Sequence, residues 1–292
     1  MTPTEEQARQ PKAHAAGAVL SEAVPPGSAS AEAGACPVQA VAGHPALGPA
    51  REASARASLA GLVLRPEILA RLEAVVQENS RADVLFSRGL APCRRLLMAG
   101  PDGCGRRLAA RYIASRLGLP VASFDLALLL GLPRAKARRS IENLFAKADQ
   151  ARSCFLLPGF GSLLAASRAQ PPLGLAEALL HELAGDASAS LFFVLAGEEV
   201  LGRPEVTRAF DDALAFALPD PAAVLELVRR CLGDFAGSLP ARQALLEACR
   251  GLSHRSIALA CQDELKACVL AGRASADPAS LLRALRRRAF AE

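Results

Sequence analysis

The sequence lacks a long apolar run and has no apolar segment at its start. No uninterrupted hydrophobic stretch reaches the roughly 18–20 residues that cross a bilayer, although 51% of the 292 residues are hydrophobic. The first residues, MTPTEEQARQPKAHAA, lack the apolar core of a secretory signal. These absences predict a cytoplasmic protein with no membrane partner, and the hydrophobic content predicts a substantial folded core.

The cysteines lack the spacing of a metal site. The sequence has eight cysteines and no C-x-x-C pair. His254, Cys261 and Cys268 recur every seven residues, which is too long a spacing for one metal ion on one helix. We therefore predict no metal site and reduced thiols that pack in the core. The cysteines are Cys36, Cys93, Cys104, Cys154, Cys231, Cys249, Cys261 and Cys268.

A concentrated charge is also lacking. The formal net charge is only +5, and nucleic-acid binders usually gather their basic residues in a patch, so a nucleic-acid partner is not predicted. The densest basic run, LLRALRRRAF, places Arg283, Arg286 and Arg287 at helical spacing. A solvated helix face near a C-terminus is the favoured interpretation, and contact with a polyanion or a partner is the alternative.

The chain divides into three parts by composition. Residues 1–58 have few large aliphatic or aromatic side chains, so they cannot offset their ordering entropy and are predicted to be disordered. Residues 59–218 alternate strand and helix patterns, and residues 219–292 show helix patterns only. Near-continuous apolar strands indicate a parallel sheet covered on both faces. The predicted strands are 95–99, 121–126, 154–160, 190–197 and 213–218, and the predicted helices of the middle part include 66–78, 105–117 and 173–184.

A glycine-rich loop joins the first of these strands to a helix. Residues 96–109 read LLMAGPDGCGRRLA. Gly100 and Gly105 have the spacing of the phosphate-binding signature G-x-x-x-x-G-K-[ST], in which backbone N–H groups close around phosphates. Arg106 and Arg107 replace the Lys and the Ser or Thr of that signature. The candidate binding residues for ATP or ADP are Gly100, Pro101, Asp102, Gly103, Cys104, Gly105, Arg106, Arg107 and Leu108.

Taken together, these segments resemble the AAA family of ATPases, in particular stand-alone bacterial members with one module. The similarity is collinear from about Leu62 to Ala289, and includes RRLLMAGPDGCG, CFLLPGFGSL, SLFFVLAG, RAFDDALAFALPDP and GLSHRSIALACQDELKACVLAG. The resemblance implies an α/β fold with a P-loop NTPase-type parallel sheet covered by helices, followed by a small all-helical lid domain. It also implies assembly into a ring.

The family's motifs for nucleotide chemistry are degenerate in this sequence. In the family, the loop Lys contacts the β- and γ-phosphates and the next residue holds Mg²⁺. Arg107 places a positive group where that metal ion would sit, so the resemblance implies that Mg²⁺ does not bind. The following strand should end in Asp-Glu, for Mg²⁺ and for activation of water, but Pro158 and Gly159 stand there.

The sensor and arginine-finger positions differ as well. Gly197 stands where the family has a polar residue that senses the γ-phosphate. The arginine-finger segment reads RAFDD, so Ala209 replaces one arginine and Arg208 remains beside it. The other departures are at the pore-loop positions, Pro133, Ala135 and Lys136, and in the second sensor region, His254 and Arg255.

Three functional hypotheses follow. The first is a pseudoenzyme without catalytic residues, which keeps the fold and acts as a structural or regulatory module through self-association or with an active AAA relative in a ring. The alternative is an active ATPase that remodels proteins, with Asp102 and Asp125 as the nearest acidic replacements. A third hypothesis is a module that binds ATP or ADP without hydrolysis. Asp102 would repel phosphate there unless it points away.

Overall fold

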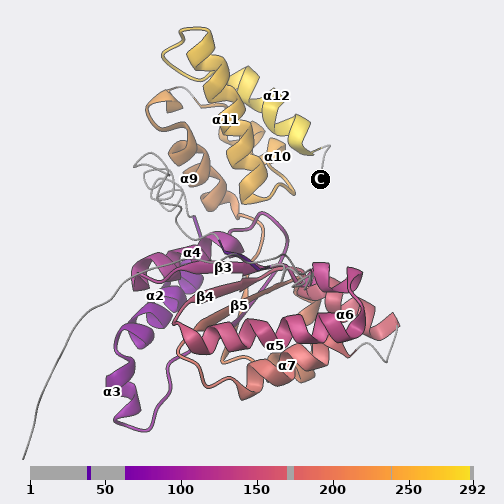
Figure 1. The fold of residues 1–292 in the computed structure, drawn as a ribbon. Coiled ribbons are helices and arrows are strands. Elements are labelled where there is room, and N and C mark those ends of the chain that lie inside the picture. Colours follow the sequence, from indigo (N-terminus) through magenta and orange to yellow (C-terminus); the bar gives the residue numbers. More distant parts are fainter. Residues whose placement is uncertain (1–37, 41–62, 170–173, 238, 290–292) are drawn as a thin grey trace, which may run out of the picture. The chain divides into compact units, whose positions relative to one another are not determined.

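The structure, a computed structural model, describes residues 38–40, 63–169, 174–237 and 239–289. Six strands of this part form one sheet in the order β1-β3-β4-β5-β2-β6. Figure 1 labels three of them, β3, β4 and β5. The last five strands of that order pair in parallel, and β1 pairs antiparallel with β3. The strands are β1 (Val38–Ala40), β2 (Arg95–Ala99), β3 (Val121–Phe124), β4 (Cys154–Leu157), β5 (Leu191–Ala196) and β6 (Asp212–Ala215).

Both faces of the sheet are buried, as the near-continuous apolar strands predict. Alternate residues of β5 point to opposite sides, so Phe192 and Val194 join one hydrophobic cluster and Phe193 and Leu195 join another. On the first face, the Phe192 ring stacks on Phe145, with ring centroids 5.0 Å apart. The sheet therefore lies between two layers of helices.

Different helices cover the two faces of the sheet (Figure 1). Helices α5, α6 and α7 contribute to the first cluster, and α2 and α4 contribute to the second. Short helices lie in the connections between strands. The helices of this part are α2 (Pro66–Ser80), α3 (Ala82–Phe86), α4 (Arg106–Leu117), η1 (Leu126–Gly131), α5 (Arg134–Gln150), α6 (Phe160–Ala169), α7 (Leu175–Gly185), η3 (Glu198–Val200) and α8 (Pro204–Thr207).

A helical part of the chain follows β6, and its helices share a hydrophobic cluster. Asp220 caps its first helix by accepting a hydrogen bond from Ala223 N at 2.8 Å. The Glu264 side chain is only 2% exposed and accepts hydrogen bonds from Arg273 Nη1 and Asp277 N, each at 3.0 Å. These bonds join α11 to the loop before α12. The helices are α9 (Pro221–Leu232), η4 (Gly233–Ala236), α10 (Arg242–Ala248), α11 (His254–Leu270) and α12 (Pro278–Ala289).

The predicted fold class is confirmed, with local differences. Strand β2 occupies the predicted residues, whereas β4 ends at Leu157 because Pro158 and the positive φ of Gly159 break the extended backbone. Helix α6 was not predicted. Leu69, expected on the inward stripe of α2, is 42% exposed. The predicted boundaries 59–218 and 219–292 remain predictions, and the predicted disordered segment 1–58 lies outside the described residues except for β1.

Candidate nucleotide site

The glycine-rich loop lies between β2 and α4, as predicted. The loop needs glycine where its φ angles are positive and where another backbone segment comes close. Gly100 has φ +142°, and its N–H donates to Ala196 O of β5 at 3.1 Å. A Cβ added at Gly100 would lie 2.1 Å from Phe216 O, a backbone atom that cannot move away cheaply. Gly105, the residue before α4, has φ +93°, a conformation that favours glycine. The loop backbone therefore depends on glycine whether or not a ligand binds.

A groove runs along this loop and collects most of the predicted binding residues. It is also lined by residues at the carboxyl ends of β4 and β5 and by residues of α9 and α11. Cys104 is the exception, since it is buried and packs in the hydrophobic cluster of α2 and α4. The predicted residues that line the groove are Gly100, Pro101, Asp102, Gly103, Gly105, Arg106, Arg107 and Leu108.

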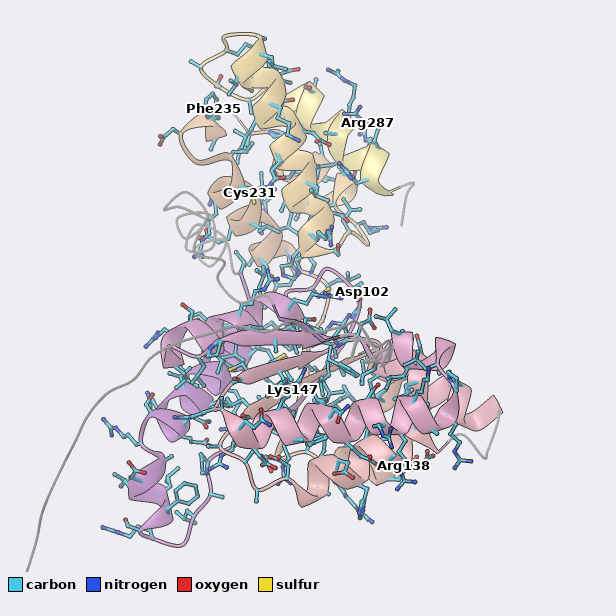
Figure 2. The ribbon with its side chains drawn as sticks, viewed as in Figure 1. Asp102, Arg138, Lys147, Cys231, Phe235 and Arg287 are labelled. Carbon is cyan, nitrogen blue, oxygen red and sulfur yellow. The ribbon has the colours of Figure 1, made fainter. Side chains whose placement is uncertain are left out.

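Arg106 is turned into the protein. The residue is 8% exposed, and its guanidinium donates one hydrogen bond to Ala196 O and another to Asp102 Oδ1. Burial lowers the pKa of Arg106, and the nearby Asp102 carboxylate opposes that shift. Asp102 is itself fully exposed in the loop, at the position labelled in Figure 2. The expected repulsion of phosphate by Asp102 is thus offset by its pairing with Arg106.

Other arginines give the groove a positive character. Arg107 is exposed and lines the groove together with Arg111, Arg230 and Arg255. Arg230 also forms an ion pair with Glu226, with Nε and Oε1 2.6 Å apart. A groove with several arginines and a helix N-terminus favours anions electrostatically.

The carboxyl end of β4 carries no polar side chain. Pro158 and Gly159 follow this strand, and the Pro158 carbonyl accepts a hydrogen bond from Leu126 N at 2.9 Å. Gly159 has φ +84°, and a Cβ added to it would lie 2.7 Å from both Ala127 N and Asp125 Oδ1. Asp125 Oδ1 accepts a hydrogen bond from Ala127 N at 3.0 Å and thereby caps η1. The Asp125 carboxylate therefore occupies space beside Gly159 that a side chain there would need.

A second carboxylate lies at the end of β5, and sequence reasoning missed it. An added Cβ on Gly197 would lie 2.1 Å from Glu199 Oε2, and one on Gly161 would lie 3.4 Å from Glu199 Oε1. Glu199 is also close enough to Arg106 to raise the pKa of that guanidinium. The signal in the sequence was the pair Glu198-Glu199, which follows a buried strand after the single residue Gly197. Within the described residues, no group of three or more His, Cys, Asp or Glu side chains is arranged to hold a metal ion.

The remaining predicted positions belong to the arginine-finger segment, the second sensor region and the pore loop. Ala209 is 8% exposed and packs in the first hydrophobic cluster, whereas Arg208 is exposed at the end of α8. Arg255 N donates to Gly103 O at 3.0 Å and joins the start of α11 to the loop. Burial lowers the pKa of His254 at the same helix start, against an opposing hydrogen bond with the Val63 backbone. The pore-loop positions Pro133, Ala135 and Lys136 are exposed at the start of α5.

Comparison with known proteins agrees with this architecture. Residues 96–215 match the family described as "ATPase family associated with various cellular activities (AAA)". The crystal structure of the FIGL-1 AAA domain superposes with a TM-score of 0.59 at 18% identity, covering 77% of this chain and 80% of that one. At this identity the superposition shows the shared fold.

Sequence relatives belong to the same family. An uncharacterized AAA family ATPase, y4kL of Sinorhizobium fredii, is 27% identical over 223 residues, which are 72% of this chain and 65% of the relative. The nuclear valosin-containing protein-like protein of Mus musculus is 25% identical over 181 residues, 57% of this chain and 20% of that protein. The peroxisomal ATPase pex6 of Schizosaccharomyces pombe is 33% identical over 72 residues, 25% of this chain and 8% of that protein. The chain thus spans less than two thirds of each of these relatives.

Proposed function

We propose that this chain, which carries an AAA-family domain over residues 96–215, is a module that does not hydrolyse ATP and acts as a structural or regulatory protein. The observation that carries the proposal is the composition of the sheet edge facing the groove. Pro158, Gly159 and Gly197 follow the two strands whose ends should carry a metal ligand, a base and a phosphate sensor. None of these three residues has a side chain that can bind a cation or accept a proton.

The two loop arginines support the same proposal. Phosphoryl transfer depends on a cation that contacts the β- and γ-phosphates and on Mg²⁺ that neutralises developing charge. Arg106 donates to Ala196 O and Asp102 Oδ1, so its guanidinium is already engaged inside the protein. Arg107 offers a positive charge in place of the hydroxyl oxygen that Mg²⁺ prefers. We therefore propose that Mg²⁺ has no role in this groove.

Binding of ATP or ADP without hydrolysis is compatible with the groove. The N–H groups of a glycine-rich loop hold phosphate without help from side chains. The exposed Arg107, with Arg111 and Arg255 along the same groove, would supply the charge that Mg²⁺ supplies elsewhere. Binding of this kind would not depend on Mg²⁺, because the arginines neutralise the phosphates directly.

An active ATPase that remodels proteins is the second candidate, and one observation favours it. The Asp125 and Glu199 carboxylates lie beside Gly159 and Gly197, next to the positions that lack functional side chains. In this candidate function, the two carboxylates from neighbouring loops would replace the missing base and metal ligand. Asp102, the other acidic candidate, is paired with Arg106 and serves this role less well.

A module that catalyses no reaction of its own would act by binding another protein. We propose a cytoplasmic protein that associates with itself or with an intact AAA relative in a ring, where the exposed Arg208 would face a neighbouring nucleotide. No helix within the described parts of the chain is long and apolar enough to span a membrane. Pull-down with a catalytically intact AAA relative, compared between wild type and Arg208→Ala, tests this part of the proposal.

The experiment that separates the two candidates measures phosphate release and the heat of ATP and ADP binding, with and without Mg²⁺. We expect no phosphate release above a protein-free control, and we expect any binding heat to be unchanged by Mg²⁺. The variant Glu199→Gln and its matched control Glu198→Gln make the test specific. Magnesium-dependent turnover that is lost in Glu199→Gln and kept in Glu198→Gln would overturn the proposal and establish the active ATPase.

A further inference from the structure

The groove extends well beyond the glycine-rich loop. Its lining follows α11 from His254 to Leu265, which is about three turns, or about 16 Å, of helix. The groove has a volume of about 1630 Å³, whereas pockets for small ligands usually measure about 300–1,000 Å³. A phosphate group held by the loop would therefore fill only one end of the groove.

Arginines of three helices line this groove. Arg107 and Arg111 are four residues apart on α4, so they share one face of that helix. The Arg255 Cβ lies 3.1 Å from the position of a Cβ added to Gly103, which places Arg255 beside the loop. Arg230 of α9 is already in an ion pair within its own helix. Arg107, Arg111 and Arg255 are all exposed, and we call these three side chains the groove arginines.

The carboxylates that line the groove are already engaged. Asp102 forms an ion pair with Arg106, and Asp125 Oδ1 accepts a hydrogen bond from Ala127 N at 3.0 Å. Within the described part of the chain, no ion pair joins a groove arginine to a carboxylate. The charge of the groove arginines is therefore available to an anionic ligand, and it comes from both α4 and α11.

The lining of the groove offers no aromatic ring on which a base could stack. Among the described residues that line it, none is Phe, Tyr or Trp. Many of its uncharged side chains are small or aliphatic, including Ala127, Leu227 and Leu259. Proteins that bind single-stranded nucleic acid stack its bases on aromatic side chains. The lining therefore favours a ligand made of phosphate groups over one that also carries bases.

We propose that the groove binds inorganic polyphosphate, a linear chain of condensed phosphates. The terminal phosphate lies on the N–H groups of the glycine-rich loop, and the following phosphates pair with the groove arginines. A guanidinium group can donate two parallel hydrogen bonds to one phosphate, so each arginine holds one unit of the chain. The inference rests on one part of the proposed function, namely that the loop binds phosphate without Mg²⁺.

The test is a calorimetric titration of the full-length protein, in EDTA, with inorganic triphosphate and with a longer linear polyphosphate. We expect the longer chain to bind about tenfold more tightly than triphosphate. Arg111→Ala should weaken binding of the longer chain about tenfold and that of triphosphate less than about twofold, because Arg111 lies one helical turn beyond Arg107. The matched control is Arg287→Ala, which removes the same charge from an exposed position on α12, labelled in Figure 2 and outside the groove lining. It should leave both dissociation constants within about twofold of wild type.

Three results would overturn the inference and leave the proposed function standing. The first is equal affinity for triphosphate and for the longer chain. The second is equal weakening by Arg111→Ala and Arg287→Ala, which would place the polyanion on α12. The third is tight binding of single-stranded DNA that carries the same number of phosphates as the polyphosphate. Conversely, Mg²⁺-dependent phosphate release from ATP would overturn the proposed function, whereas a chain-length preference that depends on Arg111 would still support polyphosphate binding.

Discussion

The two edges of the parallel sheet, one where the strands begin and one where they end, differ in their polar side chains. At the edge where the strands begin, charged and hydroxyl side chains bond to each other and to the backbone. At the edge where the strands end, facing the groove, glycine, proline and a few arginines predominate.

The starting edge is held by a network around Asp211. This carboxylate accepts hydrogen bonds from the backbone N–H groups of Arg94 and Arg95, at 2.8 and 2.9 Å, and from the Arg95 guanidinium. Arg95 Nη1 also donates to Leu183 O at 3.0 Å. Ser190, at the start of β5, donates to Ala148 O at 3.0 Å. These bonds tie β2, β5, β6 and two helices together before the hydrophobic strands begin.

The edge where the strands end is organised by glycines and by Arg106. Gly100 and Gly159 are required by backbone geometry, and Arg106 donates the side-chain hydrogen bond that reaches across from the loop to β5. The side-chain hydrogen bonds that join several strands and helices thus lie at the edge away from the groove.

The largest expected effect is at the starting edge. Asp211→Ala removes a partly buried carboxylate and leaves the Arg95 guanidinium and two backbone N–H groups without their partner. We expect a loss of about 3 kcal/mol in the free energy of unfolding, measured by urea denaturation. The exposed Asp234 in η4 offers a matched control, and Asp234→Ala should change stability by less than about 0.5 kcal/mol. Equal effects of the two variants would contradict this ranking.

The same carboxylate predicts a dependence on pH. Burial raises the pKa of Asp211, but the hydrogen bonds from Arg95 and from the two backbone N–H groups outweigh burial, so the folded-state pKa lies below its ordinary value. Its stabilisation is therefore complete above the unfolded pKa, about 3.9, and is lost as pH falls through the folded value. The difference in stability between wild type and Asp211→Ala should shrink as pH falls from about 5 to about 3. A difference that grows on acidification would refute the assignment.

A smaller effect distinguishes two glycines at the ending edge. Gly159→Ala places a side chain at φ +84° and 2.7 Å from Ala127 N, a backbone atom, so we expect a loss of about 1–3 kcal/mol in unfolding free energy. Gly197 has φ −70°, and its added Cβ would meet only the end of the flexible Glu199 side chain. Gly197→Ala should therefore cost less than about 1 kcal/mol. Thermal and urea unfolding of the two variants measure the difference in stability. A larger loss in Gly197→Ala than in Gly159→Ala would contradict this prediction.

The smallest predicted difference separates the two loop arginines. Arg106→Ala leaves the Ala196 carbonyl without one of its donors, and we expect a loss of about 1–2 kcal/mol. Arg107 is exposed, so Arg107→Ala should stay within about 0.5 kcal/mol of wild type while weakening any binding of anions. Urea unfolding and titration with inorganic triphosphate measure the two effects. A larger loss of stability in Arg107→Ala than in Arg106→Ala would contradict the structural role of Arg106 and the anion-binding role of Arg107.

Sequence reasoning succeeded where a short pattern determines structure. The apolar run at Arg95–Ala99, followed by Gly100, defines a buried strand and the turn after it, and the structure places β2 at those residues. The order of the strands in the sheet could not be predicted, because hydrophobic periodicity does not say which strands are neighbours. Leu69 fits the inward spacing of α2 but lies exposed, since helical periodicity is only an average over neighbouring turns.

The candidate site was predictable in its backbone and less so in its side chains. The glycine spacing located the loop, but the burial of Arg106 depends on Ala196, which is ninety residues away in the sequence. The position of Glu199 over Gly197 depends on the path of η3 after β5, and no local pattern encodes that path. Asp102 and Arg106 are four residues apart and form an ion pair in the structure, a contact that was not predicted, since Asp102 was expected to repel phosphate.

The hydrogen bond from Arg255 N to Gly103 O has a consequence for any ligand of the loop. A Cβ on Gly103 would lie 2.5 Å from Ser253 Oγ, so the start of α11 rests directly on the loop backbone. A ligand that needs the loop to move must first separate these two segments. If the open form were present in about one molecule in 100, the apparent affinity would fall by about 100-fold relative to a loop that is always open. The affinity of such a ligand would then measure the strength of this contact between α11 and the loop.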